Sequence, residues 1–143
     1  MCGAHATVRG LLSELVASAT DVCVADMEAG LEHLSRGTAG KADVLVAVIE
    51  PYYRSLETGA RVVDLGKELG ISKLITVANK VRNDDDRQAI ERFCLSRGLV
   101  LDAVLPHDEA VLSADREGRA VLDLSPSCSY VQCVEGLASS IVH

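Results

Sequence analysis

An acidic residue, Asp26, ends the apolar run DVCVAD, and Gly30 follows it in the segment MEAG. A carboxylate at the tip of a strand is typical of phosphate sites that hold Mg²⁺ through its water shell. A glycine shortly afterwards lets a backbone N–H group come close to a terminal phosphate. The pattern has a second interpretation, because an Asp at a strand end often only caps the next turn.

Polar residues also follow two later apolar runs. The pair Asn79-Lys80 ends KLITVANK, and Pro106-His107-Asp108 follows LVLDAVL. An amide offers both a hydrogen-bond donor and an acceptor to the edge of a purine base, so Asn79 is a candidate for base recognition. The simpler interpretations are that Asn79 forms a turn and that Pro106 ends a strand before a helix.

The elements that must position these residues alternate along the chain. Continuous apolar runs predict buried strands at 21–27, 43–49, 73–79 and 99–105. Helical patterns are expected at 8–16, at 53–69 with a stop at Gly70, from the aspartates at 84–86 to Gly98, and from Ser125 as N-cap with Pro126 as first residue. This order predicts a three-layer α/β fold with a parallel sheet, formed by residues 1–143 as a single unit. In such sheets ligands bind beyond the carboxyl ends of the strands.

The composition limits the classes of function. The 143-residue chain is 48% hydrophobic but only 3% aromatic, so its core is expected to be aliphatic. Its formal net charge of −7 disfavours binding to nucleic acid or to an anionic membrane surface. No apolar run approaches the roughly 18 residues that span a bilayer, and a cytoplasmic protein with reduced cysteines is expected. Cys23 and Cys94 lie in apolar patterns and are expected to be core residues.

Four segments, taken in order, resemble the MinD/ParA family of P-loop ATPases. DVCVADMEAGLEHLSRGT is similar to the family's Walker B strand and switch II region, and ADVLVAVIEPYYRSLETGARV to its next strand and helix. ITVANKV is similar to the strand that leads to the family's adenine-side Asn, and VLPHDEAVLSADREGRAVLD to its closing segment. The segment DMEAGLEHLSRGT and the segment CGAHATVRGLL near the start of the chain resemble the CooC-type branch of the family, the maturation ATPases of nickel carbon monoxide dehydrogenase.

The resemblance implies an ATP-dependent dimer that holds ATP and Mg²⁺ between protomers and couples hydrolysis to delivery of nickel to an apo-metalloenzyme. It implies that Asp26 holds the Mg²⁺-bound water and that Gly30 senses the terminal phosphate. In the same way, Asn79-Lys80 would lie at the adenine, and the backbone near Pro106 and Asp108 would close over the base.

The chain departs from the family pattern because it has no Gly-rich P-loop. No segment resembles GKGGxGKT, and SRGTAGK at 35–41 lacks the strand before it and the Ser/Thr after it. The chain therefore looks like the C-terminal half of such an ATPase, and hydrolysis of ATP by these residues alone is not expected. Because the P-loop strand is central in the family, the Walker B strand would lack a neighbour. This predicts pairing with another chain, either in a homodimer or with a partner that carries a P-loop.

The opening residues form a candidate metal site. On a helix, Cys2 and His5 share a face, and two copies related by a two-fold axis would supply two sulfur and two nitrogen ligands for Zn²⁺ or Ni²⁺. CooC-type proteins carry a C-x-C pair that binds metal at the dimer interface, and Cys2 resembles the second cysteine of that pair. An exposed thiol and a surface histidine are the simpler interpretation.

Two other interpretations of the whole chain are open. A truncated homologue without a phosphate site would be non-catalytic and would act as a dimerisation or partner-binding module. A phospho-acceptor receiver domain also carries acids at strand ends. It needs an acid pair on its first strand and Lys-Pro after a late strand, where this chain has Lys80-Val81.

Overall fold

The computed structural model describes residues 22–27 and 42–142. Three parallel strands form its sheet in the order β1 (Val44–Ile49), β2 (Lys73–Val81) and β3 (Ala103–Pro106). The helices in the described ranges are α3 (Tyr53–Glu68), α4 (Asp84–Arg97), α5 (Glu109–Arg116), α6 (Val121–Leu124) and α7 (Ser129–Val142). The alternation of strands and helices confirms the predicted α/β fold.

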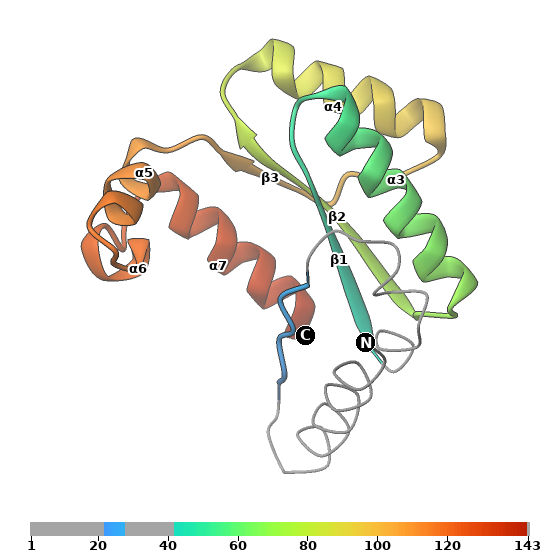
Figure 1. The fold of residues 1–143 in the computed structure, drawn as a ribbon, viewed down its shortest axis with the longest axis horizontal. Helices are drawn as coiled ribbons and strands as arrows, with labels where there is room; N and C mark the ends of the chain where they lie inside the picture. Colours follow the sequence, from blue (N-terminus) through green and yellow to red (C-terminus); the bar gives the residue numbers. More distant parts are fainter. Residues whose placement is uncertain (1–21, 28–41, 143) are drawn as a thin grey trace, which may run out of the picture.

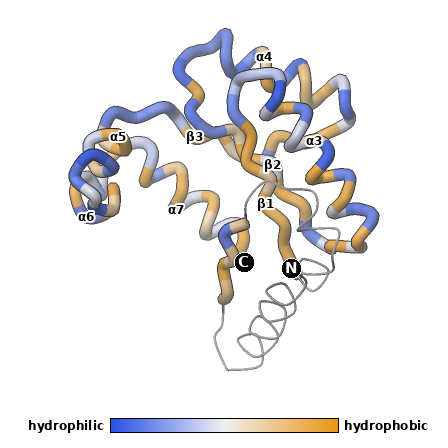
Figure 2. Tube along the Cα trace, in the orientation of Figure 1, coloured by the Kyte–Doolittle hydropathy of each residue, from blue (hydrophilic) through white to orange (hydrophobic). Residues whose placement is uncertain are grey.

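The helices lie on both faces of the sheet, with α3 and α4 on one face and α7 on the other (Figure 1). A buried cluster under α3 and α4 includes Ile49, Ala78 and Ile90. On the opposite face, Val77 and Leu105 pack with partly buried residues of α7. Figure 2 shows β1 as a hydrophobic stretch. Its Ala47 and Ile49 are buried, whereas Val46 and Val48 on the opposite face are exposed. The core is aliphatic, as the composition predicts.

Local signals place the ends of α3 and α4 where the sequence predicts them. Gly70 follows α3 with φ 73°, and the N–H groups of Gly70 and Ile71 donate to the carbonyls of Lys67 and Gly66. At the start of α4, the Asn83 side chain accepts a hydrogen bond from the Asp86 N–H group at 2.9 Å. Gly98 ends α4 in the left-handed conformation with φ 64°.

The predicted start of the last helix is wrong. Ser125 is not its N-cap: the Cys128 N–H group donates to the Ser125 carbonyl at 3.1 Å, which closes a turn, and α7 begins only at Ser129. Pro126 is the second residue of this turn, a position that proline favours because its φ angle is fixed. The short α6 before the turn was not predicted from the sequence.

The predicted strand at 21–27 is not part of the sheet. Residues 22–27 lack regular secondary structure, and Val24 is 88% exposed. Cys23 is therefore exposed and not a core residue, whereas Cys94 is buried as predicted. A strand exists only when its backbone groups pair with a neighbour, and residues 22–27 have no such neighbour in the part of the chain that the structure describes.

Candidate functional site

The carboxyl ends of the three strands meet at one edge of the sheet because the strands are parallel. This edge brings together four of the residues that the sequence selects. Asn79 and Lys80 lie near the end of β2, Pro106 ends β3, and Asp108 directly precedes α5. We refer to this group of residues, with Glu50 at the end of β1, as the carboxyl-edge site.

Asn79 and Lys80 are held by two hydrogen bonds. The Lys80 backbone N–H donates to Asn79 Oδ1 at 2.9 Å, and Lys80 Nζ donates to Glu50 Oε1 at 2.9 Å. The side chain of Lys80 is 57% exposed and that of Glu50 is 24% exposed. The hydrogen bond and charge of Glu50 raise the pKa of Lys80, so the ammonium group stays protonated. The pair joins the ends of β1 and β2.

Glu50 is a residue to which sequence reasoning assigns no role. The signal was present, because Glu50 directly follows an apolar strand just as Asp26 follows an apolar run. Its backbone N–H donates to Ser55 Oγ at 2.8 Å, which fixes the turn between β1 and α3. The carboxylate is thereby presented at the edge of the sheet, within reach of Lys80.

Asp108 links two helix N-termini. Its Oδ1 accepts a hydrogen bond from the Ala110 N–H at 2.9 Å, and its Oδ2 accepts from Ser129 Oγ at 3.0 Å and from the Tyr130 N–H at 3.4 Å. The hydrogen bonds from Ala110 and Ser129 lower the pKa of the carboxyl group. The carboxylate therefore holds α5 and α7 together, and its hydrogen-bonding capacity is largely used within the protein.

The backbone around Pro106 is also fixed. Pro106 is half-buried at the end of β3, as the simpler interpretation of the sequence predicts. The N–H group of the next residue, His107, donates to the Val81 carbonyl at 2.8 Å. The chain therefore leaves β3 while still bonded to the last residue of β2, and Asp108 follows directly.

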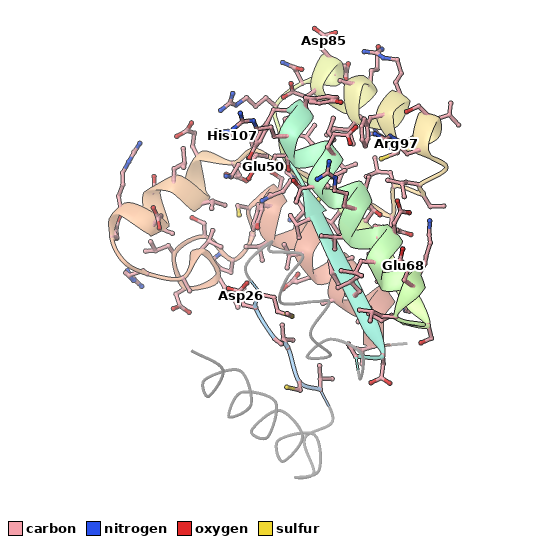
Figure 3. The ribbon with its side chains drawn as sticks, turned by 45° about the vertical axis from the view of Figure 1, so that its right-hand side comes forward. Asp26, Glu50, Glu68, Asp85, Arg97 and His107 are labelled. Carbon is pink, nitrogen blue, oxygen red and sulfur yellow. The ribbon has the colours of Figure 1, made fainter. Side chains whose placement is uncertain are left out.

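The structure does not bring Asp26 to the carboxyl-edge site. Asp26 is exposed on the extended segment 22–27, and Figure 3 shows it apart from Glu50 and His107. Gly30 and the candidate metal ligands Cys2 and His5 lie outside the described residues. Within ranges 22–27 and 42–142, no group of three or more His, Cys, Asp or Glu side chains could hold a metal ion. No helix in the same ranges is long and apolar enough to cross a membrane.

Comparison with curated proteins finds relatives over most of the chain. No protein-family model matches. The chain is 40% identical to the carbon monoxide dehydrogenase accessory protein CooC of Rhodospirillum rubrum over 130 residues, which are 90% of this chain and 48% of that protein. It is 36% identical to an uncharacterised ATP-binding protein of Methanocaldococcus jannaschii over 85% of this chain and 47% of that protein. The chain thus spans about half the length of the curated relatives it matches.

Solved structures with a similar fold are cell-division ATPases and their relatives. The MinD ATPase of Pyrococcus furiosus matches 94% of this chain and 56% of its own, with a TM-score of 0.75 and 22% identity. The MinD protein of Aquifex aeolicus matches 91% of this chain and 57% of its own, with a TM-score of 0.71 and 16% identity. Because both identities are below 25%, the two structures establish the fold of the chain and nothing further.

Proposed function

We propose, from the premise that the chain belongs to the CooC-type branch of the MinD/ParA family of ATPases, that it binds an adenosine nucleotide at the carboxyl-edge site. The nucleotide would serve the maturation of a nickel carbon monoxide dehydrogenase. The observation that carries this proposal is the 40% identity to CooC over nine-tenths of the chain. Asn79 supplies the amide that would contact the base. The Glu50–Lys80 ion pair and the hydrogen bonds of Asp108 hold the strand ends and the helix starts around it.

Asn79 suits recognition of adenine. The Lys80 N–H can donate only to the amide oxygen, so this hydrogen bond fixes which way the Asn79 amide points. A second lone pair on Oδ1 remains to accept from the exocyclic amine of adenine, while Nδ2 donates to the ring nitrogen N7. Guanine presents two acceptors at the same positions and cannot satisfy the amide oxygen. We therefore expect adenosine nucleotides to bind more tightly than guanosine nucleotides.

The phosphate side of the proposal depends on residues beyond the carboxyl-edge site. The exposed carboxylate of Asp26 has the oxygen chemistry that Mg²⁺ prefers, and Gly30 would admit a backbone N–H to the terminal phosphate. Bound Mg²⁺ would neutralise charge on the phosphates. Hydrolysis also needs the backbone amides of a P-loop, which we expect a partner or another part of the protein to supply.

The proposed partners are a second copy of the chain and an apo-metalloenzyme in the cytoplasm. Cys2 and His5 from two protomers would bind Ni²⁺ or Zn²⁺ between them. Titration of the chain with each metal tests this site, with Cys2→Ser as the variant and Cys23→Ser, an exposed cysteine in the described part, as the matched control. We expect Cys2→Ser alone to lose metal binding, and equal binding by the two variants would remove Cys2 from the site.

Asn79→Asp tests the nucleotide proposal. The substitution replaces the Nδ2 donor by a second acceptor facing N7 of adenine, and we expect affinity for ADP to fall about tenfold, as for one lost hydrogen bond. The matched control is Asn83→Asp, the same chemical change at the N-cap of α4, where Asp caps equally well. The measurement is titration with ADP and GDP followed by calorimetry or by NMR chemical shifts.

Three results would contradict the proposal in different ways. Equal affinity for ADP and GDP would show that Asn79 does not read the base. An equal loss in both variants would show that the effect is general and not specific to the site. Complete lack of nucleotide binding, together with a dimer in light scattering, would favour the alternative of a non-catalytic dimerisation module.

A further inference from the structure

A β-bulge interrupts the pairing of β2 with β3 at the carboxyl-edge site. Val77 pairs with Ala103 and Ala78 with Val104, but the next pair is Val81 with Pro106. Two residues of β2, Asn79-Lys80, therefore lie opposite a single residue of β3. Bulges of this kind are common next to active sites, where they change the direction of a side chain.

The bulge reverses the alternation of side chains at the end of β2. In a regular strand, residues two apart share a face, so Lys80 would lie on the same face as Ala78. Instead, Ala78 and Val81 both pack in the cluster under α3 and α4. The additional residue thus removes Asn79-Lys80 from the regular pattern and presents both at the edge of the sheet.

The backbone of Lys80 makes the bulge possible. Lys80 has φ 57° and is the one non-glycine residue with a positive φ in the part of the chain that the structure describes. This left-handed conformation is unfavourable for a residue with a Cβ atom, and such strained residues gather at functional sites. This φ sets how the peptide group between Asn79 and Lys80 is joined to the chain that continues to Val81, which is paired with Pro106. The N–H of that peptide group donates to Asn79 Oδ1 at 2.9 Å.

The ammonium group of Lys80 is engaged elsewhere. It donates to Glu50 Oε1 at 2.9 Å across the ends of β2 and β1. The two halves of the residue thus have separate partners, with the backbone bonded to the Asn79 amide and the side chain bonded to a neighbouring strand. At least one of the three donors of the ammonium group is therefore used within the protein.

We propose that Lys80 is a positioning residue: its left-handed backbone, and not its ammonium group, holds the Asn79 amide in the orientation that recognises adenine. This inference rests on the proposed function for the identity of the base, but the orientation of Asn79 is a property of the nucleotide-free protein and can be tested separately.

Three substitutions in the full chain separate the backbone from the charge. Lys80→Gly removes the ammonium group and keeps the left-handed conformation without strain. Lys80→Met removes the charge and retains an unbranched side chain. Lys80→Val places a β-branched residue where φ is positive, which its Cβ substituents oppose. If the backbone conformation of residue 80 orients Asn79, the glycine and methionine variants preserve the orientation of the Asn79 amide and the valine variant does not.

The first measurement uses the protein without nucleotide. The side-chain amide of Asn79 is followed by ¹⁵N NMR, and the Asn79→Asp variant, which removes this signal, assigns it among the side-chain amides of the two asparagines and two glutamines of the chain. We expect the Asn79 signals to shift in Lys80→Val and to stay in Lys80→Gly. Unchanged signals in Lys80→Val would overturn the positioning role whatever the ligand.

The second measurement is the ratio of ADP to GDP affinity in the same variants. We expect Lys80→Gly and Lys80→Met to retain the preference for ADP. In Lys80→Val we expect the ratio of ADP to GDP affinity to fall about tenfold, the effect of one misplaced hydrogen bond. Equal losses in all three would show that the ammonium group, and not the backbone conformation, is required and would overturn the inference. Absence of ADP binding by the unaltered chain, with the Asn79 amide shifted only in Lys80→Val, would refute nucleotide binding and retain the positioning of Asn79.

Discussion

Gly59 lies where α3 packs against Ile49 of β1, and Gly59→Ala measures that contact. A Cβ atom at this position would lie 2.1 Å from Cγ2 of Ile49, whereas ordinary van der Waals contacts are 3.4–4 Å. Ile49 is 1% exposed, and its Cγ2 is attached to the branched Cβ of a strand residue, so it cannot rotate away easily. Helix and strand must therefore separate if the alanine is to fit.

The expected magnitude follows from two opposing effects. Alanine is favoured over glycine in a helix by about 1 kcal/mol. Overpacking a closely packed core costs about 1–3 kcal/mol, and the short contact with Ile49 favours the upper end. We expect Gly59→Ala to lower the free energy of unfolding by about 2 kcal/mol, as the difference between these two effects.

Two other helical glycines are controls for the same substitution. At Gly136 a Cβ atom would meet nothing within 4 Å, so Gly136→Ala should raise the free energy of unfolding by about 0.5–1 kcal/mol. At Gly66 it would meet the ends of the Leu74 and Leu45 side chains at 2.7 and 2.8 Å, which can move more easily, so an intermediate effect is expected. Urea unfolding followed by circular dichroism measures all three.

A double mutant identifies the cause of the Gly59 effect. Ile49→Ala removes the clashing Cγ2 atom, at a cost of about 2–5 kcal/mol for the lost core packing. In that background Gly59→Ala should cost much less than in the unaltered chain, which is a coupling between contacting residues. A Gly59→Ala protein as stable as Gly136→Ala, or an unchanged effect in the Ile49→Ala background, would refute the packing argument.

Three further predictions concern single side chains. The folded protein should lose stability as the pH falls through the pKa of Asp108, because hydrogen bonds hold that pKa below its unfolded value of about 3.9; urea unfolding from about pH 6 to pH 2 should show a weaker acid dependence in Asp108→Asn. Asn83→Ala should lower the free energy of unfolding by about 1 kcal/mol, whereas Asn83→Asp should change it little, as measured by the same assay. The thiol of Cys23 should react at once with a disulfide reagent, whereas the buried Cys94, whose pKa burial raises, should react only on unfolding, and mass spectrometry of digested samples distinguishes the two.

The ends of α3 and α4 could be predicted because their signals are local. Gly70 and Gly98 adopt the left-handed conformation that glycine favours, and they follow amphipathic segments directly. The start of α7 could not be predicted in this way, because Asp108 caps it from another part of the chain. Ser125 and Pro126 have the residue types of a helix start, but they form a turn instead.

The residues of the carboxyl-edge site could in part be predicted from the sequence, but the contacts between them could not. The apolar run that ends in Asn79-Lys80 indicates both residues, although β2 continues to Val81. The bulge that changes the direction of both depends on the register with β3, which the sequence of β2 does not contain. The role of Glu50 depends in the same way on the distance between the ends of β1 and β2.

Residues 22–27 and β1 show why composition alone does not define a strand. Both are apolar and rich in β-branched residues, yet β1 pairs with β2 from Val44 to Ile49, while Val24 in the other segment is 88% exposed. In the part of the chain that the structure describes, β1 has a paired neighbour and residues 22–27 have none. Even β1 depends on its surroundings, because Ala47 is buried under α3 while Val48 on its opposite face is 55% exposed. A sequence therefore encodes the capacity to form a strand, and the packing of the whole chain decides whether that strand forms.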